Sequence, residues 1–227
     1  RSDFYGHCGL VVDEAAFRVL VNDNAEHQRE VAALGRKEVI VQVNTPWGPS
    51  QGATLYAEGV LFHSTAGHGG FQLTPRRNCS IHPALLRPKG FYEEDVEWAA
   101  VAQGLPDIFT TRERHQADET IRNFWPEAWE RIHGRELLPG ESRERDRQIF
   151  ERTHAEDWIV IAAVQSEFRR GFTEVVATRG GKRGERVDQR RFLIPVEEYD
   201  SGPFGFVIDE VRHPIYDGPS SFVGYRG

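Results

Sequence analysis

The chain contains 227 residues, of which 39% are hydrophobic and 28% are charged, and these values are typical of a globular protein and exclude a disordered one. The net charge of −7 at pH 7 disfavours nonspecific coating of nucleic acid. No apolar run approaches the roughly 18 residues of a membrane span, and two cysteines form no disulfide scaffold, so we expect a cytoplasmic protein without a membrane partner.

Residues 1–37 form a first predicted segment of mixed character. The sequence holds no methionine, even at position 1, so we expect the native start to be missing. Residues 13–21 fit either a short helix or a strand. Residues 24–34 have the apolar spacing of a helix, with Asn24 as its predicted N-cap and Gly35 just beyond its last turn.

A strand-rich segment is predicted at residues 38–110. Val39–Val43 is rich in β-branched residues and predicts a strand. The runs at residues 53–57 and 60–62 flank Glu58-Gly59, and this pattern is typical of a β-hairpin.

The same segment continues with a predicted strand at residues 71–73 and an irregular stretch at residues 75–90. A helix is predicted at residues 91–103, because Gly104 and Pro106 follow it as stop signals. The start of this helix carries four carboxylates, those of Glu93, Glu94, Asp95 and Glu97.

A helical segment is predicted at residues 111–156. Thr110-Thr111-Arg112-Glu113 has the capping-box pattern, and apolar residues follow it at helical spacing. Pro126 interrupts this spacing, either as a kink or as the first residue of a second helix. A charged helix is then predicted at residues 142–153, with buried contacts from Ile149 and Phe150.

An antiparallel lobe is predicted at residues 157–227. Trp158–Val164 is apolar on both faces and predicts a central strand. Residues 172–178 and 190–194 predict a hairpin, followed by a strand at residues 204–208 and a tail at residues 219–222 that folds back. The whole order predicts an α+β fold, with two groups of antiparallel strands separated by a helical middle segment.

The greatest concentration of possible chemistry is at His63-Ser64-Thr65-Ala66-Gly67-His68-Gly69-Gly70. Imidazoles exchange protons near neutral pH and bind metals, and glycines let a ligand approach the backbone. The candidate catalytic residues are therefore His63 and His68, and the candidate binding residues are Ser64, Thr65, Gly69 and Gly70. The alternative is an ordinary tight turn whose histidines bond to the backbone.

The acidic stretch is the expected partner of this loop. Imidazoles combined with carboxylates suit a divalent metal such as zinc or iron, or supply a general acid and base. Glu94 is the candidate catalytic carboxylate, and Glu93 and Asp95 are candidate binding residues. The alternative is that these carboxylates only stabilise the positive end of a helix dipole. The metal and any other cofactor stay unknown.

A basic hairpin lies between Arg169 and Arg191, where eight basic residues outnumber three acidic ones, so the rest of the chain carries −12. Arg183, at the glycine-rich tip, is a candidate phosphate contact because arginine matches phosphate geometry. The alternative is a solvated hairpin end that only aids solubility.

These motifs resemble an uncharacterised domain family found on plasmids and conjugative elements of alphaproteobacteria. The resemblance covers Thr45-Pro46-Trp47-Gly48, His63-Ser64-Thr65-x-x-His68-Gly69-Gly70, Tyr92-Glu93-Glu94-Asp95 with Trp98, Arg191–Pro195 and Tyr216–Phe222. It implies no fold or activity. It does imply a role in mobile-element biology, such as transfer, maintenance or counter-defence, and it favours one joint site of the histidine loop and the acidic stretch.

Three hypotheses for function follow. The first is a His/carboxylate site that binds or acts on a small molecule or nucleotide, with or without a metal. The second is a non-enzymatic acidic module that docks on a host protein. The third is phosphate or nucleic-acid contact through the basic hairpin. We favour the first, with a small molecule or a host protein as the expected partner and nucleic acid less favoured.

Overall fold

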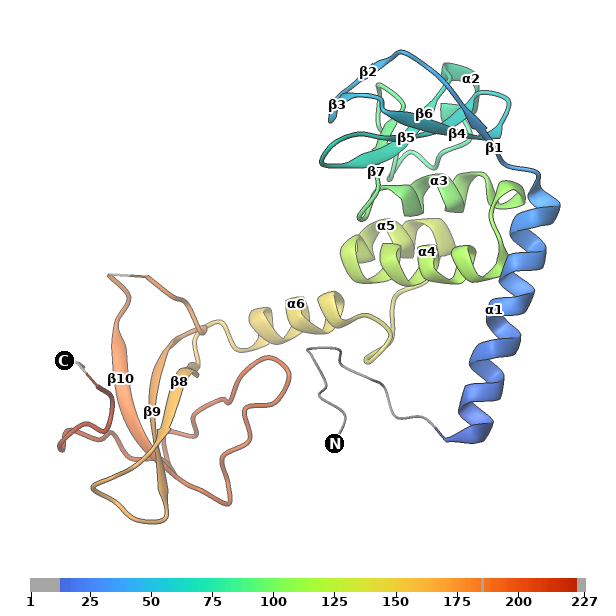
Figure 1. Cartoon of the computed structure of the whole chain (residues 1–227). Helices are drawn as coiled ribbons and strands as arrows, with labels where there is room; N and C mark the ends of the chain where they lie inside the picture. Colours follow the sequence, from blue (N-terminus) through green and yellow to red (C-terminus); the bar gives the residue numbers. More distant parts are fainter. Residues whose placement is uncertain (1–12, 185, 224–227) are drawn as a thin grey trace. The chain divides into compact units, whose positions relative to one another are not determined.

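The computed structural model describes residues 13–184 and 186–223, and the chain divides into two compact units, residues 1–141 and 142–227. No helix within these described ranges is long and apolar enough to cross a membrane. The α+β prediction is confirmed, because antiparallel sheets lie before and after a helical middle segment in the sequence (Figure 1).

The first unit is built on an antiparallel sheet with the strand order β1-β4-β5-β6-β7. Its strands are β1 (Lys37–Val39), β4 (Gly52–Ala57), β5 (Val60–Ser64), β6 (Gly69–Leu73) and β7 (Phe91–Glu93). A short ribbon of β2 (Asn44–Thr45) and β3 (Gly48–Pro49) lies beside it. The predicted hairpin is confirmed, because β4 and β5 pair across Glu58-Gly59 and Gly59 takes the positive φ of +80° that suits a tight turn.

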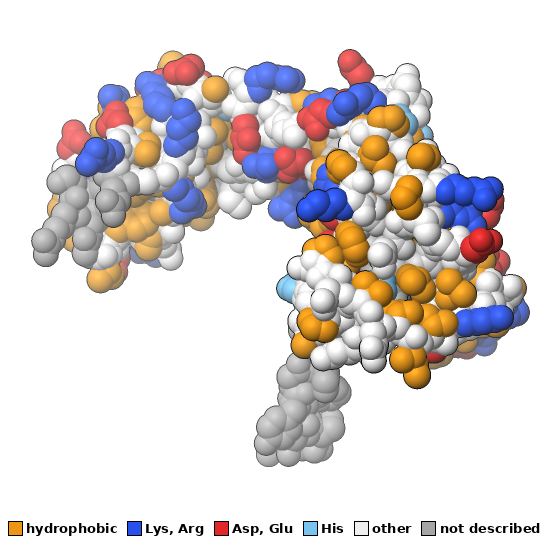
Figure 2. Space-filling view, turned by 90° about the horizontal axis from the view of Figure 1, so that it is seen from above, with side chains coloured by type: hydrophobic (Ala, Val, Ile, Leu, Met, Phe, Trp, Pro, Cys, Tyr) orange, Lys and Arg blue, Asp and Glu red, His pale blue; other side chains and the backbone are white. Residues whose placement is uncertain are grey.

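The two faces of this sheet have different neighbours, because side chains alternate along a strand. Phe62, Phe71 and Tyr92 are cross-strand partners on one face and pack into the core with α3. His63 and Glu93 lie opposite Gly70 on the other face. In Figure 2, which views the first unit from its sheet side, hydrophobic and charged side chains are intermixed.

Helices pack under the core face of the sheet in Figure 1. They are α3 (Trp98–Gly104), α4 (Thr111–Phe124) and α5 (Pro126–His133), while α1 (Glu14–Leu34) runs along the side and α2 (Pro75–Asn78) and a 3₁₀ turn (Pro106–Ile108) are short. The capping box is confirmed, because the Thr110 and Glu113 side chains each accept a hydrogen bond from the other residue's backbone amide. Pro126 is the first residue of α5, and Gly134 ends that helix with a φ of +65°.

The second unit contains α6 (Arg143–Thr153) and a sheet in the order β10-β9-β8. Its strands are β8 (Trp158–Gln165), β9 (Phe172–Arg179) and β10 (Gln189–Pro195), so the predicted hairpin is confirmed. The tail folds back as predicted, because the fully buried carboxylate of Glu174 in β9 accepts hydrogen bonds from Ser220 Oγ and Ser221 N, each at 2.8 Å. Arg191 completes this contact with Nη1 at 3.0 Å from Glu174 Oε1.

Two predictions in the first 43 residues are wrong. Asn24 lies inside α1, which is one continuous helix, and therefore caps nothing, although Gly35 does end the helix with a φ of +61°. The predicted strand Val39–Val43 overlaps β1 only at Val39, and Ile40 is 100% exposed. Its β-branched residues find no neighbouring strand there, so local propensity is overridden.

Three predictions after residue 141 are also wrong. β8 is an edge strand rather than a central one, and only Trp158 and Ile159 in it are buried, because β9 occupies the centre. Residues 204–208 make an isolated bridge to Ile159 instead of a strand. Helix α6 has no buried residue, so its predicted buried contacts, Ile149 and Phe150, are incorrect.

Candidate metal centre

The predicted histidine loop is the hairpin turn between β5 and β6. Ser64 ends β5 and pairs with Gly69, which begins β6. The turn is closed by Thr65, whose backbone amide and hydroxyl both donate to the carbonyl of His68, at 2.9 and 2.6 Å. Because the hydroxyl adds a second bond across the turn, the backbone of His68 is fixed close to the end of the sheet.

His63 is fully buried on the sheet face that lies away from the helices. Its Nδ1 is 3.0 Å from Ser50 Oγ and its Nε2 is 2.9 Å from Gln72 Oε1. Both ring nitrogens therefore have protein partners, and neither is directed at a ligand. The structure does not bring His63 to the carboxylates of the acidic stretch.

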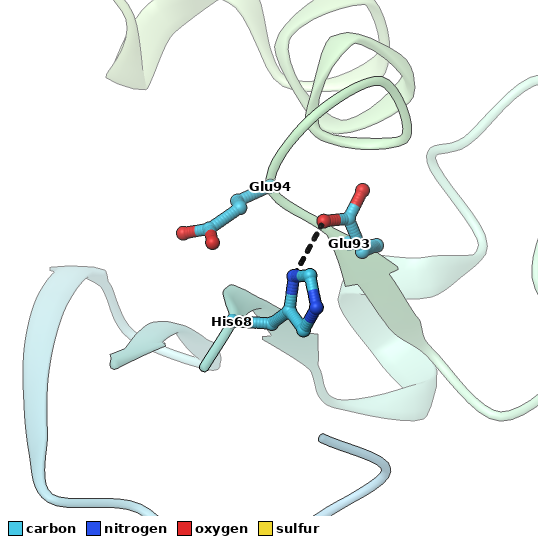
Figure 3. Close-up of side chains that lie close together, drawn as sticks. All are labelled: His68, Glu93 and Glu94. Atoms are coloured by element: carbon cyan, nitrogen blue, oxygen red, sulfur yellow. Dashed lines mark ion pairs between the residues drawn. The ribbon is translucent and has the colours of Figure 1, made fainter. Parts of the chain in front are cut away.

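His68 is the accessible histidine of the loop, with 62% of its side chain exposed. Its Nδ1 is 3.9 Å from Glu93 Oε1, which is too long for a hydrogen bond. One ligand atom each from His68, Glu93 and Glu94 lies within 4.8 Å of the other two (Figure 3). These three side chains are the candidate metal centre.

The predicted helix at residues 91–103 is wrong at its start, and this error changes the role of the acidic stretch. Phe91–Glu93 is the edge strand β7, and the helix begins only at Trp98. Gly70 pairs with Glu93, and Glu94 N donates to Gly69 O at 3.1 Å. Strand pairing, not a helix dipole, therefore places Glu93 and Glu94 beside His68.

Glu93 is held so that one carboxylate oxygen points to His68. Its Oε2 accepts a hydrogen bond of 2.8 Å from Asp95 N, and its own amide donates to Glu97 Oε2 at 3.1 Å. Glu97 is in turn bound by Arg87 Nε at 2.6 Å. Glu93 Oε1 is buried and has no hydrogen-bond partner among the described residues. A buried oxygen that accepts no hydrogen bond is costly, and a cation would satisfy it.

Two of the three glycines of the loop, Gly69 and Gly70, are required by close packing. A side chain on Gly69 would meet Glu94 Oε2 at 2.5 Å, and one on Gly70 would meet the Trp47 ring at 2.4 Å. Trp47 also packs edge-on against Phe91 of β7, with 6.0 Å between ring centroids. The glycines thus let the Glu94 carboxylate and the Trp47 ring approach the hairpin backbone.

The remaining predicted residues lie outside the group of three. Ser64 is exposed at the strand end, and Asp95 contributes its amide to Glu93. Arg183 lies in the second unit, where its Nη2 donates to Ile161 O at 2.7 Å and ties the hairpin tip to β8. Two other arginines of the basic hairpin, Arg179 and Arg190, stack on the Trp158 ring.

Sequence reasoning missed the residues that build the surroundings of this centre. From the sequence, Trp47 stands out only as part of the Thr45-Pro46-Trp47-Gly48 motif, and nothing in the sequence singles out Gln72 or Ser50. The available sequence signal for a shared site is that the Trp47 motif and the histidine-loop motif both belong to the family resemblance. Neither motif by itself shows on which face of the sheet it lies.

The chain belongs to a family described as Domain of unknown function (DUF7007), whose match spans residues 40–155 and thus half of the chain. The candidate metal centre lies within the matched residues, and the match extends through α6. No curated protein and no solved structure matches the chain.

Proposed function

We propose that this domain binds a divalent metal ion through His68, Glu93 and Glu94 and uses it to bind or act on a small molecule or nucleotide. The observation that carries the proposal is the convergence of one imidazole nitrogen and two carboxylates within 4.8 Å of one another. Bonds of about 2.1 Å place two ligands of one ion up to about 4.2 Å apart. The 3.9 Å between His68 Nδ1 and Glu93 Oε1 is within that limit, and the group of three, which spans up to 4.8 Å, needs only a small side-chain movement to close on an ion.

The choice of metal follows from the ligand atoms. One imidazole nitrogen and two carboxylates suit zinc, iron or manganese better than magnesium, which prefers oxygen ligands alone. The described residues supply three protein ligands, so a zinc ion held by them would keep a position open for water or a substrate oxygen. A metal held in this way supplies a polarised oxygen or an activated water at neutral pH.

Neighbouring residues hold two of the proposed metal ligands in place. Asp95 N holds the Glu93 carboxylate, and the Thr65 turn fixes the backbone of His68, so the Glu93 carboxylate and the attachment point of the imidazole are positioned before an ion arrives. Preorganisation of this kind lowers the cost of binding. The exposure of His68 keeps the open positions accessible to a substrate from solvent.

Calorimetric titration of the untagged protein with Zn²⁺ and Mn²⁺ tests this function. We expect one site per chain in the wild type and a loss of binding of at least about 100-fold in His68→Ala and in Glu93→Gln, since each removes a ligand. His115→Ala, which changes an exposed histidine elsewhere in the first unit, is the matched control. Wild-type affinity in the His68 and Glu93 variants would show that the centre binds no metal.

We also propose that the domain acts in mobile-element biology, on the support of the motif resemblance alone. A survey of the genes that flank members of this family tests the setting. Frequent association with transfer or plasmid-maintenance genes is expected, and a chromosomal housekeeping context would refute it.

A further inference from the structure

A second polar pocket lies at the opposite end of β5 from the candidate metal centre. It has a volume of about 400 Å³ and is formed by the β4–β5 turn, the end of β6 and the short helix α2. Its lining residues are Glu58, Gly59, Thr74, Arg76, Arg77 and Ser80. Two guanidinium groups and two hydroxyls thus surround one small cavity.

The donors of this pocket are positioned but largely unused. Arg77 Nε donates to the backbone carbonyl of Glu58 at 2.8 Å, which fixes the guanidinium, and its two Nη groups make no hydrogen bond to residues 13–184 or 186–223. Thr74 is the N-cap residue of α2, yet its hydroxyl makes no capping bond. Within the described part of the chain, Arg76 forms no ion pair. Gly59 closes the cavity wall, since a side chain there would meet Thr74 Oγ1 at 2.6 Å.

We propose that this pocket binds the phosphate group of a small phosphorylated molecule. Arginine forks form bidentate, charge-assisted hydrogen bonds with phosphate oxygens, and the hydroxyls of Thr74 and Ser80 supply further donors. The volume lies within the usual range for small-ligand sites. Nucleic-acid strands instead follow long basic grooves with aromatic side chains for stacking, and this lining contains no aromatic residue.

The proposal is independent of the metal centre. The Glu58-Gly59 turn precedes β5 and His68 follows it, so the five residues of β5 separate the two sites by roughly 17 Å. The carboxylate of Glu58 lies among the lining residues and opposes an anion there. Its removal should therefore strengthen binding, whereas a change at His68 should leave binding untouched.

Titration of the full chain with inorganic phosphate at low ionic strength tests the proposal. Arg76→Ala should weaken binding roughly ten-fold, because it removes a charge-assisted hydrogen bond without removing an internal contact. Arg77→Lys should weaken it as well, since lysine retains the charge but loses the fork. Glu58→Gln should tighten binding about two-fold. Arg29→Ala, an exposed arginine of α1, and His68→Ala are the controls and should bind phosphate as the wild type does.

Three results would overturn the proposal. The first is absence of phosphate binding in the wild type, and the second is an Arg76→Ala variant that binds as tightly as the wild type. The third comes from a parallel titration with a single-stranded DNA of about 20 nucleotides. Tight, salt-sensitive binding of that strand, lost in Arg76→Ala, would assign the pocket to a nucleic-acid backbone instead.

Discussion

His63 and His68 are five positions apart in the sequence, yet their environments are opposite. The ring of His63 is buried with both nitrogens paired, and the ring of His68 is mostly exposed beside two carboxylates. His63 is therefore tied into the fold, whereas His68 is accessible from solvent, as the proposed metal centre requires.

Alanine variants of the two histidines should separate these roles. His63→Ala leaves Ser50 and Gln72 without their partner and should lower the free energy of unfolding by about 1–3 kcal/mol. His68→Ala should change it by less than about 0.5 kcal/mol, because the side chain is exposed. Urea denaturation of both variants measures the difference, and equal losses of stability would contradict these assignments.

Glu113 is the residue whose charge should make the first unit sensitive to acid. Burial raises the pKa of Glu113, but hydrogen bonds from the Arg36 guanidinium and the Thr110 amide outweigh burial and hold the pKa below its ordinary value of 4.5. A lowered folded-state pKa gives stability that is complete above pH about 4.5 and is lost as the pH falls through the folded value.

Glu113→Gln should reveal this contribution. The variant leaves Arg36, whose side chain is only 11% exposed, without its anion and should lose on the order of 3 kcal/mol at neutral pH. The difference from the wild type should shrink in unfolding experiments carried out near pH 3, because the unfolded wild type then binds a proton at Glu113 more readily than the folded wild type does. A difference that is the same at both pH values would refute the linkage.

The residue types of the centre could be predicted from the sequence, but their grouping could not. Histidine and glutamate side chains are typical of metal binding and acid–base chemistry, so His68, Glu93 and Glu94 are among the residues predicted from the sequence. This chemical signal could not separate His63 from His68, since the buried ring of His63 is held by Ser50, which precedes β4, and by Gln72 of the neighbouring strand β6.

At the scale of elements, the sequence predicts a structure correctly where the hydrogen bonds of that structure join residues close together in the chain. The capping box at Thr110 and the Glu58-Gly59 turn depend on neighbours within a few residues, and both are confirmed. Of the two alternatives for Pro126, the structure shows the first residue of a second helix, α5. The strand order of a sheet depends on distant partners, and for this reason β8 was predicted at the centre and β7 was predicted as a helix.

Cross-strand neighbours in the second unit test the corrected order. Val175 in β9 is fully buried and pairs with Ala163 in β8, which is exposed. Val175→Asp places an unpaired charge in the core and should unfold this unit, at a cost of several kcal/mol. Ala163→Asp should shift its melting by only a few degrees. Circular dichroism melts compare them, and a stable Val175→Asp protein would contradict the central position of β9.

At the scale of the whole chain, each unit has its own apolar core. The core of the first unit joins the sheet to α3, α4 and α5, and that of the second unit surrounds Trp158 and Phe192. We expect fragments of residues 1–141 and 142–227 each to melt cooperatively, because each retains its core. Differential scanning calorimetry of both fragments provides the check, and a fragment without a transition would show that its core is incomplete.

The metal centre is tested most directly by crystals of the protein soaked in Zn²⁺ and measured at the zinc absorption edge. An anomalous peak is expected about 2.1 Å from a ring nitrogen of His68 and from carboxylate oxygens of Glu93 and Glu94. The peak should be absent from crystals of His68→Ala treated in the same way. Wild-type crystals with no peak at these residues, or with a peak that persists in His68→Ala, would contradict the assignment.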